Sequence, residues 1–237
     1  MPGRWALYTY LVVAALVAVL VRIDVTLPAI GHLGSALVAV VFLYGPVIVA
    51  WKRKEDLVDY GFTSDPRGKN LAFAAVALAI ILPIFLVVYL GFYDVVCDTP
   101  SIRKLAPPGT CGGWDGINYE TPRLGWSFLE FCAVQIVVVA LPEELFFRGC
   151  LHHLLEQRFP PARRFLGGGI GLALLLSSAA FALVHLPKNG DPRALATFFP
   201  GLLFGWMRSA TGSIAPSVAV HAASNIWVRL LDLTFLR

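Results

Sequence analysis

The sequence is poor in charge. Only 14% of its 237 residues are charged and 57% are hydrophobic, and the mean hydropathy is +0.72. A soluble domain of this length usually carries about 25% charged residues, so the composition excludes a cytosolic globular protein. The apolar runs leave only short connections between them, and no separate soluble catalytic domain is expected.

The sequence also lacks motifs that would assign a function by themselves. Its four cysteines form no paired Cys-x-x-Cys units of the kind that bind zinc. Neither the His-Glu-x-x-His signature of zinc proteases nor the Gly-x-Ser-x-Gly turn of serine hydrolases occurs. No repeat or Pro-rich linker divides the chain, which argues against a transporter built from repeated halves. We therefore predict a single integral membrane domain over residues 1–237.

The apolar runs predict an all-α fold, a polytopic bundle of about six to seven transmembrane helices, because a span needs about 20 apolar residues. The first run follows Arg4 and is not followed by a small-x-small cleavage site, so we expect a retained anchor rather than a removed signal peptide. The sixth run is short and is expected to form a hairpin with its neighbour. The expected spans cover residues 5–21, 28–50, 71–92, 124–141, 167–185 after a glycine-rich break, 195–207 and 214–231.

The net charge is +4 and the pI is about 9.0. The basic residues form short clusters between apolar runs, a pattern that sets membrane orientation, so we expect a lipid bilayer and no nucleic acid as partner. With the N-terminus inside, residues 93–123 face outward. There Cys97 and Cys111 either close a disulfide in an oxidising compartment or remain free thiols. The expected inner cluster comprises Arg4, Lys52, Arg53, Lys54, Arg67, Lys69, Arg148, Arg158, Arg163, Arg164 and Arg208.

Two adjacent carboxylates, Glu143 and Glu144, directly follow one of the most apolar runs. Pro142 lacks an amide hydrogen, so we expect the helix to kink or restart there. Glu144 and Arg148 are four residues apart and share a helix face, which favours an ion pair, whereas Glu143 points about 100° away. The alternative is that both glutamates occupy a helix start at the cytoplasmic boundary, where the helix dipole favours acids.

Histidines interrupt two later apolar helices. His185 ends the fifth run, and His221 and Asn225 share one helix face four residues apart. A lone histidine on an apolar face is more often a satisfied core residue, but acid, base and amide together suit water-mediated amide hydrolysis. His152 and His153 are expected at the inner interface.

These residues resemble the motifs of the CPBP family of intramembrane glutamic proteases, also called the CAAX protease and bacteriocin-processing family. Glu143, Glu144 and Arg148 match its Glu-Glu-x-x-x-Arg motif, and His185 ends its Phe-x-x-x-His motif. The pair of His221 and Asn225 matches its His-x-x-x-Asn motif. The three motifs occur in the family's order within a family-like core of about residues 131–231.

The resemblance implies a role for each residue. Glu143 would activate the attacking water with help from His185, and His221 with Asn225 would stabilise the oxyanion. Glu144 would hold the site in shape together with its predicted partner, the arginine four residues on. The implied mechanism is glutamic and uses no metal or cofactor, although two histidines and a glutamate are also a possible zinc set.

The implied substrate is a membrane-anchored protein or peptide, and the favoured role is its processing or sorting. Arginine outnumbers lysine, which favours a bacterial source and the inner (cytoplasmic) membrane, where prenylated substrates are not expected. The alternatives are a non-enzymatic protein, such as a proton-coupled carrier, and a bacteriocin-immunity protein. Simple alternation of spans would separate Glu143 from His185, so their convergence requires both to lie within the bilayer around a water-filled cavity.

Overall fold

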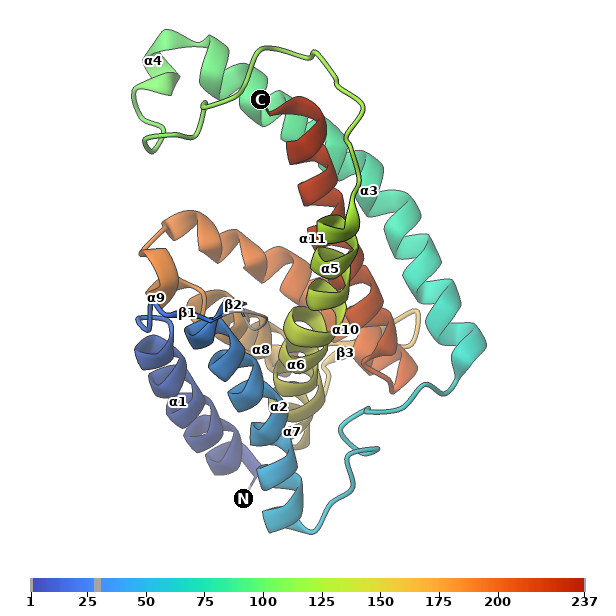
Figure 1. The fold of residues 1–237 in the computed structure, drawn as a ribbon. Coiled ribbons are helices and arrows are strands. Elements are labelled where there is room, and N and C mark those ends of the chain that lie inside the picture. The colour runs from blue at the N-terminus through green and yellow to red at the C-terminus, as the bar shows by residue number, and fades with distance from the viewer. Residues whose placement is uncertain (1, 28–30, 237) are drawn as a thin grey trace.

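Apolar sequence folds into long helices in the computed structural model, which describes residues 2–27 and 31–236. Within these residues, three helices are long and apolar enough to cross a membrane, namely α1 (Pro2–Leu20), α2 (Leu33–Arg53) and α3 (Arg67–Asp98). Figure 1 shows them with the other helices as a bundle. The predicted all-α membrane fold is confirmed. The predicted start of the second span at Pro28 lies outside the described residues.

The described residues also form two short antiparallel strand pairs, which the sequence analysis did not predict. The glycine-rich break contributes a strand to one of them instead of opening a helix. The other helices are α4 (Pro100–Arg103), α5 (Trp126–Val134), η1 (Gln135–Ala140), α6 (Leu141–Glu144), η2 (Leu145–His152), α7 (His153–Arg158), α8 (Leu172–Leu183), α9 (Leu186–Asn189), η3 (Pro192–Thr197), α10 (Phe198–Thr211) and α11 (Ala215–Phe235). The strands are β1 (Thr26–Leu27) with β2 (Gly31–His32), and β3 (Arg163–Phe165) with β4 (Gly168–Ile170), both pairs antiparallel.

The sequence analysis expected the fourth span to end at Leu141, but in the structure the helix that carries the paired glutamates continues past this residue. Segments α5, η1, α6, η2 and α7 follow one another without a break, so the backbone stays helical from Trp126 to Arg158. Segments η1 and η2 are π-helical and lie on either side of Pro142. Wider turns of this kind let a helix pass a residue that cannot donate its backbone hydrogen bond. We call this run the central helix.

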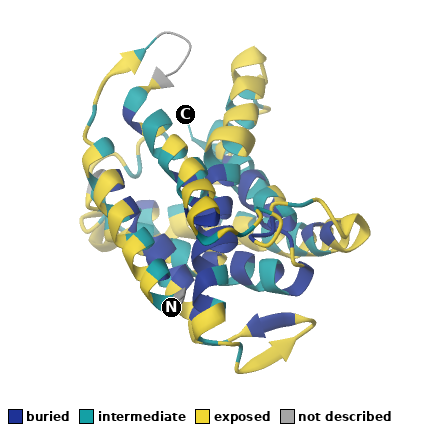
Figure 2. Ribbon diagram, turned by 90° about the horizontal axis from the view of Figure 1, so that it is seen from below, coloured by how far each residue is buried: buried dark blue, intermediate teal, exposed yellow. Residues whose placement is uncertain are grey.

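The core lies where α2 and α8 pack on the central helix. Aromatic rings fill this contact: Phe42 of α2 lies 5.3 Å from Phe146 and 5.4 Å from Phe147, and Phe147 lies 5.1 Å from Phe181 of α8. Figure 2 shows the buried residues concentrated along the middle of the molecule, with exposed residues on the outer helices. The central helix is therefore enclosed on several sides over its second half.

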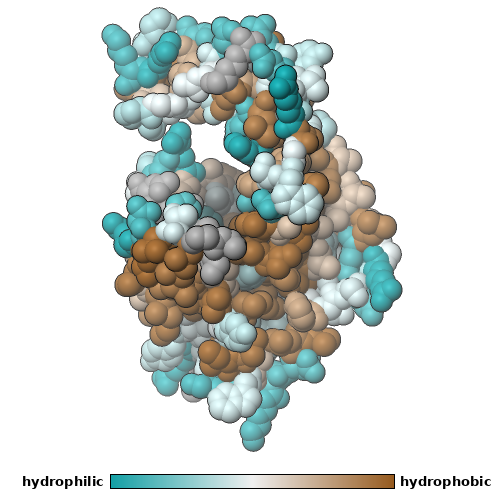
Figure 3. Space-filling model, in the orientation of Figure 1, coloured by the Kyte–Doolittle hydropathy of each residue, from teal (hydrophilic) through white to brown (hydrophobic). Residues whose placement is uncertain are grey.

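Large apolar side chains cover much of the outer surface. On α3, for example, Leu71 is 71% exposed and Val87 is 70% exposed. Figure 3 shows apolar side chains across the middle of the molecule and polar ones gathered toward its upper and lower ends. A surface of this kind is suited to lipid rather than water, and the chain is an integral membrane protein.

At the upper end in Figure 1, the C-terminal part of α3 carries α4 and the long connection to α5. The helix runs six residues beyond the predicted end of the third span, as far as Asp98. Cys97 and Cys111 are joined by a disulfide in the structure. The Trp114 ring stacks on Tyr93 at 5.3 Å, which fixes the connection against α3.

At the opposite end, a turn after α2 holds the central helix. Arg53 donates hydrogen bonds of 2.8 and 2.6 Å to the two carboxylate oxygens of Glu55, and Tyr60 donates a third of 2.7 Å. These bonds, those from Arg53 above all, lower the pKa of Glu55 to about 2. A side chain at Gly149 of the central helix would place its Cβ 2.8 Å from the backbone oxygen of Tyr60. The turn therefore packs directly on the helix backbone, and Ile214 donates to the oxygen of Gly61 at 2.9 Å.

Candidate active site

Three separate parts of the chain bring the predicted site residues together. Glu143 lies on α6 of the central helix, His185 in the turn between α8 and α9, and His221 on α11. The Oε2 atom of Glu143 lies 4.0 Å from Nε2 of His185 and 3.9 Å from Nε2 of His221. The Glu143 side chain is only 16% exposed. A carboxylate and two imidazoles thus face one another below the surface.

The length of the central helix explains how Glu143 meets His185. The helix runs for 15 residues beyond Glu143 before it ends at Arg158, and α8 with the turn after it returns over a similar number of residues, from Leu172 to His185. At 1.5 Å per residue, each path covers about 20 Å. The two side chains therefore reach the same depth, which removes the separation that simple alternation of spans predicted.

Glu144, the residue after Glu143, contacts both Arg148 and His221. Its Oε2 lies 3.2 Å from Nε of Arg148, and its Oε1 lies 2.9 Å from Nδ1 of His221. The side chains of Glu144 and Arg148 are 0% and 1% exposed. A carboxylate has no proton to donate in its ionised form, so the nitrogen of His221 donates in this contact.

Aromatic rings surround the arginine. Its guanidinium carbon lies 4.0 Å from the ring centre of Phe181 and 5.2 Å from that of Phe204. Phe204 also stacks on the ring of His221 at 5.3 Å. Rings offer a buried cation a favourable electrostatic environment without competing for its hydrogen bonds. Arg148 therefore lies in the core, not in the inner basic cluster where the sequence analysis placed it.

Glycines allow α10 to pack closely against Arg148 and His152 of the central helix. A Cβ at Gly201 would lie 3.3 Å from Nη2 of Arg148, and one at Gly205 would lie 3.2 Å from Nδ1 of His152. His152 is only 1% exposed, so it is a core residue and not the interfacial residue that was predicted. Its Nε2 lies 3.5 Å from Oε1 of Glu156.

The hydrogen bond at Nδ1 of His185 determines which tautomer its neutral ring adopts. Nδ1 lies 2.7 Å from the backbone oxygen of Phe181, which only accepts hydrogen bonds, so Nδ1 carries a proton. In a neutral ring, Nε2 is then an acceptor directed at Glu143. The rings of Phe181 and His185 also meet edge to face with their centroids 4.8 Å apart, so one phenylalanine packs against both the imidazole and the buried arginine.

Asn225 has a partner that the sequence analysis missed. Its Nδ2 donates a 2.8 Å hydrogen bond to Oε1 of Gln135, the first residue of η1. The signal was present, because Gln135 is a polar residue within the apolar run that precedes the two glutamates. An amide nitrogen has two hydrogens, so this bond leaves one for another acceptor.

Two cavities adjoin the site. Cavity A, about 560 Å³, lies between α1, α2 and η1, and cavity B, about 580 Å³, lies between α3, α10 and α11. Glu143 and His185 line both of them. His221 and Asn225 line only cavity B, and Gln135 lines only cavity A.

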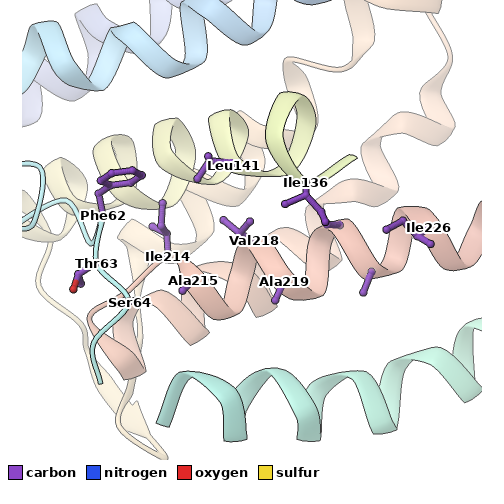
Figure 4. A pocket seen from close by; sticks show the side chains of 12 residues that line it. Phe62, Thr63, Ser64, Ile136, Leu141, Ile214, Ala215, Val218, Ala219 and Ile226 are labelled. Atoms are coloured by element: carbon purple, nitrogen blue, oxygen red, sulfur yellow. The ribbon is translucent and has the colours of Figure 1, made fainter. Parts of the chain in front are cut away.

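A third cavity of about 620 Å³ contains none of the predicted site residues. Figure 4 shows its apolar lining, with Ile136 and Leu141 of the central helix on one wall and Val218 and Ala219 of α11 on the other. It offers no group for acid–base chemistry. Among the residues that the structure describes, no group of three or more His, Cys, Asp or Glu side chains is arranged to hold a metal ion.

The fold and the site define an integral helical membrane protein with carboxylates and imidazoles buried together between its helices. Residues 125–227 match the family model described as type II CAAX prenyl endopeptidase Rce1-like. This part of the chain is similar to the CAAX protease family, and the match confirms the resemblance that the three motifs indicated. The match supports an intramembrane endopeptidase in general. Comparisons with curated proteins and with solved structures gave no match.

Proposed function

We propose that the protein hydrolyses a peptide bond of a membrane-anchored protein by means of a water molecule activated by Glu143, without a metal ion. The observation that carries the proposal is the pair of gaps at Oε2 of Glu143, 4.0 Å to His185 and 3.9 Å to His221. Both exceed the length of a direct hydrogen bond, which is at most about 3.2 Å. Each gap suits a bridging water.

Water placed between Glu143 and His185 meets two acceptors. Among the described residues, Oε2 of Glu143 is buried and has no hydrogen-bond partner. Nε2 of a neutral His185 is also an acceptor, because Nδ1 donates to the chain. A water that donates one hydrogen to each group keeps its lone pairs free for attack on a carbonyl carbon. Glu143 then takes a proton from that water and passes it to the leaving amine.

The negative charge that develops on the carbonyl oxygen needs donors on the other side. Asn225 has one amide hydrogen left after its bond to Gln135. His221 already donates from Nδ1 to Glu144 and contributes a second donor at Nε2 when both ring nitrogens are protonated. Loss of one such donor typically costs about 100- to 1,000-fold in kcat.

Glu144 and Arg148 act as positioning residues in this proposal. The contact of 2.9 Å between Glu144 and His221 sets the orientation of the imidazole, and the buried arginine holds Glu144. Neither group is required to touch substrate.

We place the substrate in the same bilayer and propose processing or sorting of a membrane-tethered protein at a bacterial inner membrane. The apolar surface, the depth of the site and the family match support a substrate that reaches the site from the membrane. A proton-coupled carrier is the competing function, since buried carboxylates and histidines also serve as relays in transport.

The decisive experiment is the Glu143→Gln variant, assayed by mass shift of a co-expressed membrane-tethered protein. The amide keeps the size of the side chain but cannot act as a base, so cleavage should fall by about 100-fold or more. Glu130→Gln is the matched control, because Glu130 is an exposed residue of the same central helix. Substantial cleavage by the Glu143→Gln protein would falsify the assignment. A chelator should leave wild-type cleavage unchanged, and proton flux in liposomes without cleavage would favour the carrier.

A further inference from the structure

Glu143 and His185 form part of the wall between cavities A and B. Both side chains line both cavities, together with Val139 one turn earlier on the central helix. The hydrogen bond between Gln135 and Asn225 joins the lining of one cavity to that of the other. The proposed general base, Glu143, therefore faces a cavity on two sides.

The two cavities differ in the size of the side chains that line them. Cavity B has aromatic walls, formed by Phe85 of α3 and by Phe199 and Phe204 of α10. Leu203 of α10 also lines cavity B. On its α2 side, cavity A is lined by Ser35, Ala36, Val38, Ala39 and Phe42, so four of these five side chains are smaller than leucine. Several aromatic walls suit a large apolar group, whereas the more polar lining of cavity A, with its smaller side chains on α2, suits backbone and small side chains.

We propose that cavities A and B are the two substrate subsites on either side of the scissile bond, and that cavity B selects a large apolar side chain. This inference rests on the proposed function. A peptide bond presented to Glu143 has chain on both sides, and an extended chain advances about 3.3 Å per residue with side chains on alternate faces. Each cavity lies within the range of about 300 to 1,000 Å³ that is usual for small-ligand sites, so each holds a short stretch of peptide.

The donors support the same arrangement. His221 and Asn225 line cavity B only, so the carbonyl oxygen of the scissile bond points toward that side. The side chain nearest to the carbonyl then enters the aromatic part of cavity B, close to Leu203. Leu203 is apolar and forms no hydrogen bond or ion pair with the groups assigned to water activation. We therefore take Leu203 as the specificity-determining position of the proposal.

The test is a panel of membrane-anchored substrates that carry Gly, Ala, Leu or Phe at each position flanking the cleaved bond. Leu203→Trp should reduce kcat/KM by about 10-fold or more for substrates with a large apolar residue at one flanking position, and should preserve cleavage of the Gly and Ala forms. Leu203→Ala should shift preference toward Phe. The control is Leu176→Trp, on a lipid-exposed position of α8.

Cavity A is tested on α2 with Ala39→Phe, and the control is Val40→Phe, at a position that is 48% exposed and lines neither cavity. Ala39→Phe should discriminate against large residues at the opposite flank of the cleaved bond, and Val40→Phe should match wild type. Equal loss for all substrates, or no change in preference with either cavity variant, overturns the subsite proposal. That result is distinct from failure of the proposed function, in which wild type cleaves no panel member or Glu143→Gln cleaves as well as wild type.

Discussion

Replacement of Arg148 by methionine tests whether the buried ion pair positions the site. Methionine is unbranched and fills much of the same volume, but it leaves the Glu144 carboxylate without its cation at a position that is 0% exposed. Removal of one partner of a buried pair typically costs about 3 to 5 kcal/mol. The three aromatic rings within 5.9 Å of the guanidinium also lose their cation.

The expected shift follows from the size of the chain. For a protein of about 150 to 250 residues, 1 kcal/mol lowers Tm by about 2 to 4 °C. The Arg148→Met protein should therefore unfold about 6 to 20 °C below wild type in detergent, as followed by tryptophan fluorescence. Activity should fall as well, because His221 loses the orientation that Glu144 provides.

Two companion variants separate the charge from the packing. Glu144→Gln combined with Arg148→Met removes both charges, so the double variant should recover part of the lost Tm, although its activity should stay low. Arg229→Met changes an exposed arginine on α11 and should leave Tm within about 1 °C of wild type. A fully stable Arg148→Met protein would refute the reasoning.

Three further predictions concern the two ends of the molecule. Mass spectrometry of non-reduced peptides should find Cys97 joined to Cys111, and reduction should cost roughly 3 kcal/mol for a loop of about 15 residues; two alkylatable thiols in intact cells would contradict the bridge. Because the pKa of Glu55 is lowered to about 2 in the folded protein from a usual value of 4.5, its contribution to stability is present above pH 4.5 and is lost as the pH falls toward 2. Glu55→Gln should therefore flatten the fall of Tm between pH 5 and pH 3, and an unchanged slope would argue against the ion pair. Gly149→Ala should destabilise the protein by about 1 to 3 kcal/mol, since the added carbon meets a backbone oxygen at 2.8 Å. The control Gly91→Ala meets nothing within 4 Å and should be neutral or slightly stabilising. Equal Tm values for the two variants would show that the turn moves to accommodate the added carbon.

Local sequence determined the helices and their chemistry. Runs of apolar residues without charge predict membrane helices, since the bilayer leaves a helix as the simplest way to satisfy backbone hydrogen bonds. The spacing of four residues between Glu144 and Arg148 predicts a shared face, and the structure places the two charges 3.2 Å apart. Such features depend on neighbours within one or two turns, which is the range over which periodicity carries information.

Only the tertiary structure decided how far the central helix extends and which groups meet at its middle. Pro142 predicted a break, yet π-helical turns on both sides absorb its missing hydrogen bond and carry the helix on to Arg158. The contacts of Glu144 with His221 and of Gln135 with Asn225 join residues 77 and 90 positions apart. No local pattern specifies such pairs, because they depend on the packing of α10 and α11 against the central helix and on the glycines that permit it. The two cavities that meet at Glu143 arise from the same packing, and they belong to the space between helices rather than to any one segment of the chain.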